Sequence, residues 1–441
     1  MNSEQQIEKT LRWLVFPLLA LVYLVQAYAQ RGLYGDGANF LLGILQSRDM
    51  PWWDRQRIFN HLITKTPTVL AIYLGMRDLA TLRVLFSSWI LFCPIFVWGL
   101  SLWSLRRDIL FWPYVMFFCF VYFSTNFFAI GEYNLCFALL GFCFAQLIRP
   151  LPERKFLRCA LLLAAFFLSL DYPATLFAGG LLFLILALKP KPEWNGAPRA
   201  YRITLMALIS LSVASSLWEI IAPRDPGNFQ RARHLDMLLL DKQFWCVLMQ
   251  GWLVTLIYVV RATWFRVSAS VLCIALFVVV LFDTMRLNPA FHCAIRAYMS
   301  LALAFCGGGL WLFRRKMVNT RRSKTATTDL LPATMAATIL LSLSLFDMLL
   351  SVDHKNFLEA YRTMVNTSRG IVPYESSPVW AILDSDRFNW DWTNPLLSVI
   401  LRKDASKGLI LNPAYYHGYQ PFDPLENIPD LDAYYHPESA N

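Results

Sequence analysis

Apolar runs alternate with short polar connections along most of the chain. Many of the runs are roughly 16–22 residues long, which suits helices that cross a bilayer at about 1.5 Å rise per residue. The pattern predicts an all-α polytopic membrane protein with eleven transmembrane helices. The predicted spans are Leu11–Ala27, Leu79–Leu102, Ile109–Phe123, Phe128–Leu147, Cys159–Leu170, Ala174–Leu188, Ile203–Ile221, Phe244–Val260, Val267–Phe282, Ala294–Phe313 and Leu331–Val352.

Two polar segments are too long to be simple connections. The first is residues 30–78, where we expect a short helix at Ala38–Leu45 and a second helix that starts at Pro51 and lies in the membrane interface. The second is the tail, where Pro395–Leu401 predicts a helix and Gly408–Leu411 a strand. The chain therefore divides into a membrane domain, residues 1–352, and a C-terminal extracytoplasmic domain, residues 353–441.

Composition supports the membrane assignment, because the 441 residues are 57% hydrophobic and 16% charged, with a mean hydropathy of +0.43. Lys and Arg concentrate in alternate connections, which places the N-terminus in the cytoplasm and the C-terminus outside it. The net charge of +10 is then mostly an orientation signal, and we expect no nucleic-acid partner. The basic connections are Arg106–Arg107, Arg149–Arg158, Lys189–Arg202, Arg261–Arg266 and Arg314–Lys324.

A cleaved signal peptide is the competing interpretation of the first run, because Ala27-Tyr28-Ala29 resembles a cleavage site. The length of the run favours a retained anchor. The nine cysteines fall in or beside predicted spans and show no metal-binding spacing. We therefore expect packing cysteines, with no metal and no cofactor.

Acidic residues cluster at the predicted outer ends of the spans, together with all six histidines. A reaction is therefore expected at the outer membrane–water boundary. Glu219, Asp283 and Asp347 are expected to be neutral or paired within the bundle. Asp36 differs, because Gly35 and Gly37 flank it and free the backbone to turn its carboxylate toward the bundle. A carboxylate near hydrocarbon is suited to act as a base.

The expected interfacial helix carries an apolar face, and most of its charged side chains lie elsewhere. Arg55 and Arg57 are candidates to present guanidinium groups to a lipid phosphate. A plain lipid-surface anchor is an equally open interpretation of the same residues. The apolar face consists of Phe59, Leu62 and Ile63.

Three stretches resemble the GT-C glycosyltransferase superfamily, in particular the protein mannosyltransferase and lipid A aminoarabinose transferase group. "GDGANFLL" at residues 35–42 resembles the acidic first-loop motif through Asp36. "GEYN" at residues 131–134 resembles the second acidic position through Glu132. "LDYPATLFAGGLLFL" at residues 170–184 resembles a turn-plus-helix in which the group often has lysine where this chain has Asp171.

The resemblance implies an enzyme that transfers a sugar from a polyprenyl-phosphate donor to an extracytoplasmic glycan, lipid or protein acceptor, in a bacterial inner membrane. It implies catalytic roles for Asp36 and Glu132, and we expect the substrate-binding residues to be Arg55, Arg57, His61, Asp171 and Tyr172. Two alternatives stay open. One is a transporter or flippase for a lipid-linked glycan, and the other is a catalytically inert membrane scaffold whose tail binds a partner.

Overall fold

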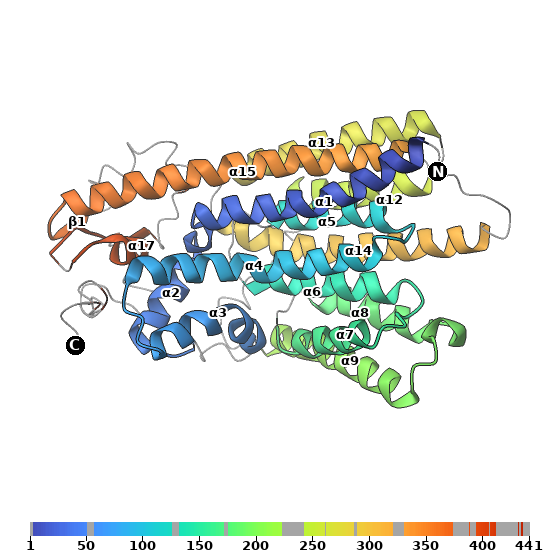
Figure 1. Ribbon diagram of the computed structural model, residues 1–441, viewed down its shortest axis with the longest axis horizontal. Helices are drawn as coiled ribbons and strands as arrows, with labels where there is room; N and C mark the ends of the chain where they lie inside the picture. Colours follow the sequence, from blue (N-terminus) through green and yellow to red (C-terminus); the bar gives the residue numbers. More distant parts are fainter. Residues whose placement is uncertain are drawn as a thin grey trace.

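The computed structural model describes residues 3–50, 57–125, 132–171, 175–222, 242–260, 262–285, 289–320, 330–373, 388, 394–404, 406–411, 431 and 434. This part of the chain is almost entirely helical, and its long helices run along the long axis of the molecule (Figure 1). The elements are α1 (Ser3–Tyr28), η1 (Arg31–Leu33), α2 (Asp36–Ser47), α3 (Ile58–Tyr73), α4 (Leu79–Leu105), α5 (Phe111–Thr125), α6 (Glu132–Leu147), α7 (Lys155–Leu168), α8 (Thr175–Ala187), η3 (Lys191–Trp194), α9 (Arg199–Ile221), α12 (Lys242–Val259), α13 (Thr263–Met285), α14 (Pro289–Thr320), α15 (Leu330–Thr367), β1 (Ile371–Pro373), α17 (Asn394–Leu401) and β2 (Leu409–Leu411).

Each of the eleven predicted spans overlaps one of these helices. By length and composition, four helical segments of the described chain are able to cross a membrane. The crossing of the other predicted spans stays a prediction. The four segments are Gln5–Tyr28, Leu79–Leu105, Arg199–Glu219 and Leu330–Thr367.

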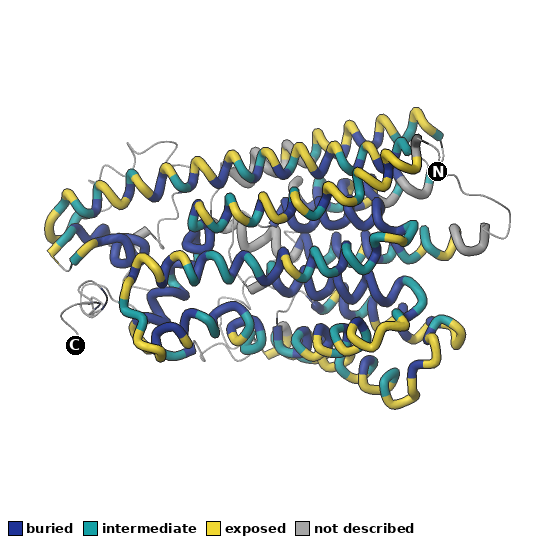
Figure 2. The backbone as a smooth tube through the Cα atoms, viewed as in Figure 1, coloured by how far each residue is buried: buried dark blue, intermediate teal, exposed yellow. Residues whose placement is uncertain are grey.

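The centre of the bundle is formed by α5, which is buried on all sides, and the helices around it bury the faces that they turn toward it (Figure 2). Every residue of α5 is buried, which explains why its sequence is apolar around the whole helix. Trp98 of α4 packs edge-on against Phe117 and Phe118 of α5, with ring centroids 5.8 and 5.4 Å apart. The helices around this core turn large apolar side chains outward, among them Leu24, Trp218 and Leu349, as lipid-facing helices do.

A second hydrophobic cluster joins the first loop to the tail at one end of the bundle. It contains Leu41 of α2, Phe357 of α15, Ile400 of α17 and Ile410 of β2. Figure 1 shows α2, α3, α17 and β1 at the end of the long axis opposite the start of α1. The first loop and the tail therefore share one core.

The tail elements follow the sequence prediction, because α17 and β2 coincide with the expected helix and strand. The strand pairs with β1 in parallel, Ile371 opposite Leu409. The helix α15 continues past Val352, the predicted end of the membrane domain, to Thr367 without a break. A rigid helix thus connects the apolar bundle directly to the tail.

Candidate functional site

The carboxylate of Asp36 stands at the first position of α2, beside a glycine in an unusual conformation. Gly35 has φ 56° and ψ −127°, which an L side chain does not readily adopt. Asp36 is half-buried and lies in the first turn of the helix, at the positive end of the helix dipole. The predicted glycine hinge is therefore present at Gly35.

Gly37 has a different role from the one expected. Positive φ occurs at Gly35 and not at Gly37, which is already helical. A Cβ on Gly37 would lie 1.8 Å from the carbonyl oxygen of Gly32, so only a glycine fits. Gly32 in turn donates its N–H to Ser87 Oγ of α4 at 2.8 Å. The segment that leads into Asp36 therefore packs closely against α4.

Gly37→Ala is expected to destabilise the protein by about 1–3 kcal/mol, the usual cost of overpacking, because the backbone of Gly32 must move. Gly180→Ala on α8 is the matched control, since its added methyl meets nothing within 4 Å. Thermal unfolding of the two purified variants measures the difference. Equal melting temperatures would contradict the tight contact at Gly37.

The helix α3 turns its polar face into the protein. Lys65 is only 1% exposed, whereas the apolar Leu62 and Tyr73 of the same helix are 42% and 67% exposed. An interfacial helix would turn this polar face to water. The buried polar residues of α3 are Asn60, His61, Thr64, Lys65 and Thr68.

Hydrogen bonds tie α3 to the connection between α7 and α8. The side-chain amide of Asn60 donates to Asp171 Oδ1 at 2.9 Å, and the N–H of Phe59 donates to the carbonyl of Leu170 at 3.4 Å. Asp171 also lies within electrostatic range of the thiol of Cys136 on α6. Buried Asp171 therefore lies where the connection after α7 meets α6 and the polar face of α3.

Phe40 links the Asp36 helix to this polar face. It lies one turn after Asp36 on the same side of α2. The ammonium of Lys65 lies over the Phe40 ring, 3.2 Å from its centroid, and the His61 ring meets the same ring edge-on at 5.6 Å. Lys65 Nζ also contacts His61 Nδ1, which accepts from the ammonium when the imidazole is neutral.

The structure thus gathers four of the predicted site residues at one end of the bundle: Asp36, His61, Asp171 and Arg57, which immediately precedes α3. Glu132 begins α6 one turn before Cys136, and its side chain lies outside the described structure. Arg55 and Tyr172 also lie outside the described residues.

Sequence reasoning missed Asn60, Thr64 and Lys65. Their signal was present, because Asn60, Thr64 and Thr68 repeat at four-residue spacing and His61 and Lys65 share that spacing one position later. The sequence shows these polar stripes, but it does not show whether they face the protein interior or the solvent. Within the described residues, no cluster of three or more His, Cys, Asp or Glu side chains is suited to bind a metal.

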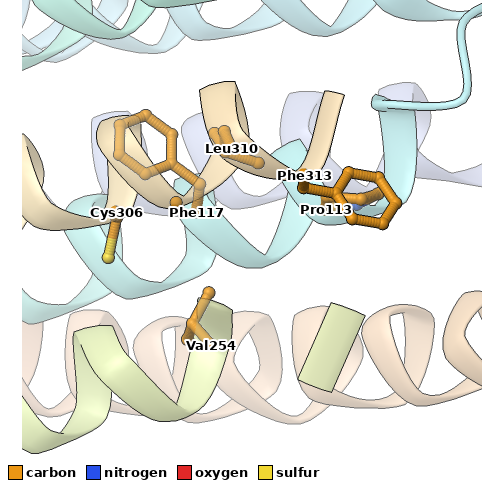
Figure 3. A pocket seen from close by; sticks show the side chains of 7 residues that line it. Pro113, Phe117, Val254, Cys306, Leu310 and Phe313 are labelled. Atoms are coloured by element: carbon orange, nitrogen blue, oxygen red, sulfur yellow. The ribbon is translucent and has the colours of Figure 1, made fainter. Parts of the chain in front are cut away.

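A narrow pocket lies elsewhere in the bundle, between α5, α12 and α14 (Figure 3). Apart from the Cys306 thiol, its lining side chains are apolar. It has no group to bind a phosphate or to move a proton, so it is a poor candidate for chemistry. The lining residues are Pro113, Phe117, Val254, Cys306, Gly309, Leu310 and Phe313.

The candidate site therefore consists of the first turn of α2, the inward face of α3 and the connection after α7. Comparison of the chain with protein-family models, with curated proteins and with solved structures found no match in any of the three.

Proposed function

We propose that the protein is a membrane-embedded glycosyltransferase of the GT-C type, which transfers a sugar from a polyprenyl-phosphate donor to an acceptor outside the cytoplasm. The observation that carries the proposal is the inward polar face of α3, with Lys65 buried against Phe40 one turn from Asp36. Charged side chains are costly near hydrocarbon and are usually retained there for function.

The donor suits this arrangement chemically. Its polyprenyl tail lies in the bilayer, so its phosphate and sugar enter the protein at the membrane boundary. Lys65 and Arg57 are proposed to bind the phosphate, because hydrogen bonds between a cationic side chain and a phosphate are charge-assisted and strong. The hydroxyl of Thr64 and the amide of Asn60 lie on the same buried face of α3 and are of the chemical type that binds the hydroxyl groups of a sugar.

Asp36 is proposed to remove the proton of the acceptor hydroxyl as that oxygen attacks the anomeric carbon and the lipid phosphate leaves. Glu132 is proposed to orient one of the substrates. The GT-C group that the chain resembles often has a lysine at the position of Asp171. Here Lys65 supplies a cation from α3, and Asp171 holds that helix through Asn60.

Reconstitution in liposomes with a labelled polyprenyl-phosphate sugar tests the function. An enzyme transfers the label covalently to an added acceptor fraction. A flippase moves the intact lipid-linked sugar across the bilayer, and a scaffold does neither. Label that crosses unchanged, with no covalent product for any acceptor, would contradict the proposal.

The proposal also requires that the α2–α3 end faces outward. A reporter fused after Asn441 is expected to be active only outside the cytoplasm, and one fused after Lys324 only inside it, because Lys and Arg concentrate in the connections predicted to be inside. Paired fusions of an alkaline phosphatase and a fluorescent protein measure this. Identical behaviour at the two positions would contradict an eleven-span topology with the C-terminus outside.

A further inference from the structure

A buried ion pair lies five residues before Asp36. Arg31 of η1 is 1% exposed and Asp347 of α15 is 3% exposed, and Arg31 Nη1 lies 2.8 Å from Asp347 Oδ1. The sequence suggested that Asp347 is neutral or paired in the bundle, and the structure shows it paired. The pair joins the segment that leaves α1 to the middle of the longest described helix.

The carboxylate of Asp347 is held on both oxygens. Gln26 of α1 donates its side-chain amide to Asp347 Oδ2 at 2.7 Å, and the hydroxyl of Tyr122 on α5 donates to Gln26 Oε1 at 3.1 Å. Arg31 Nη1 also donates to Ser351 Oγ at 3.1 Å. The side chains of α1 and η1 therefore meet at the carboxylate of α15, and α5 joins them through Gln26.

The same network continues toward Asp36. The ring of Tyr34 packs edge-on against the ring of His354 on α15, with centroids 5.6 Å apart, and His354 Nδ1 lies 3.3 Å from the carbonyl of Ala29. Burial raises the pKa of the Tyr34 phenol, so it stays neutral at this contact. Residues 31–35 are all buried, and Gly37 lies against the Gly32 carbonyl.

A buried ion pair is weak evidence for stability, because removing two charges from water costs as much as their attraction returns. An apolar contact would join η1 to α15 at lower cost. In some proteins a buried ion pair instead specifies a single arrangement of the segments that it joins. A fixed geometry matters most for a segment that must hold a reactive carboxylate.

We propose that Arg31 and Asp347 are positioning residues. They fix η1 on α15 and thereby hold Asp36 in place at the α2–α3 end of the bundle. The assignment rests on the proposed function in so far as Asp36 is the base. Neither residue touches a substrate in this scheme. The geometric part of the proposal is separable from catalysis, because it predicts how firmly α2 is docked.

The test places a cysteine at Ala38, a buried residue of α2, and another at Ala333, a buried residue near the far end of α15. Modification of each cysteine by N-ethylmaleimide in the purified protein is followed by mass spectrometry. Asp347→Asn is compared with Glu359→Gln, which removes an exposed ion pair from the same helix. Transfer kinetics are measured in parallel on the proteins without the added cysteines.

Asp347→Asn is expected to raise the labelling rate at position 38 roughly tenfold or more, with no change at position 333, because losing one partner of a buried pair releases the segment it held. The same variant should lower kcat while KM changes little. Asp347→Glu, which keeps the charge, should restore most of the protection. Glu359→Gln should behave as the wild type in every measurement.

Two results would overturn the positioning role. One is unchanged labelling at position 38 in Asp347→Asn. The other is an equal rise at positions 38 and 333, which would mean that the pair supports the fold as a whole. If labelling changes as expected and the wild type shows no transfer with any donor, the docking role stands and the proposed glycosyltransferase function fails.

Discussion

Asp36→Asn is expected to lower the rate of sugar transfer about 10²–10⁴-fold, the range that general acid–base catalysis supplies. The substitution keeps the shape of the side chain but removes the base. In the proposed reaction the acceptor hydroxyl loses its proton as it attacks. Water is a much weaker base than a positioned carboxylate and does not replace it efficiently. Because Asp36 also interacts with the N-terminus of α2, a loss of up to about 1 kcal/mol in stability accompanies the change.

The measurement is transfer from a labelled polyprenyl-phosphate sugar in liposomes, with thermal unfolding as the check on folding. Asp49→Asn is the matched control, because Asp49 lies on the same loop just after α2. It should transfer sugar at the wild-type rate. An Asp36→Asn protein that also turns over at that rate would remove Asp36 from the mechanism.

Lys65→Met is expected to weaken use of the donor by about 10–10²-fold, the range that follows from one hydrogen bond to a charged group. Methionine keeps the length of the side chain and fills the space against Phe40. It removes the buried cation that we assign to the donor phosphate. The effect should fall mainly on KM for the donor, because the phosphate carries charge in the ground state as well as in the transition state.

Lys355→Met is the control for charge at the same end of the molecule. Lys355 lies on α15 and pairs with Glu359, and its side chain is partly exposed. Donor binding by microscale thermophoresis or by competition with unlabelled polyprenyl phosphate measures the affinity of both variants. Equal affinity of Lys65→Met and Lys355→Met would exclude Lys65 from the phosphate site.

Much of the bundle was predictable because the bilayer imposes a simple rule on sequence. Long apolar runs located each expected helix. The structure adds the cap of α4, where the carboxylate of Asp78 accepts the N–H of Thr81 at 2.8 Å. The end of α15 was missed, because residues 353–367 are amphipathic and resemble a separate surface helix. Its continuation depends on packing against residues distant in the sequence, such as Ile400.

The candidate site was predicted in part for a related reason. Asp36 stood out because glycines flank it, although only Gly35 requires a positive φ and Gly37 is required by contact with Gly32. Lys65 was missed, because a polar face on a helix in a membrane loop is ordinarily a water-facing one. Its inward direction follows from tertiary contacts, with Phe40 on one side and the Asp171 connection on the other.

The central claim is that the donor's phosphate binds between α2 and the inward face of α3. Photo-crosslinking with a polyprenyl phosphate that carries a diazirine on its first isoprene unit tests it most directly, because mass spectrometry reports which residues the lipid touches. The account predicts adducts on α2 and α3 near Phe40 and Lys65, and their loss on competition with unlabelled polyprenyl phosphate. Adducts confined to the apolar pocket between α5, α12 and α14, or to the outer surface of α15, would contradict it.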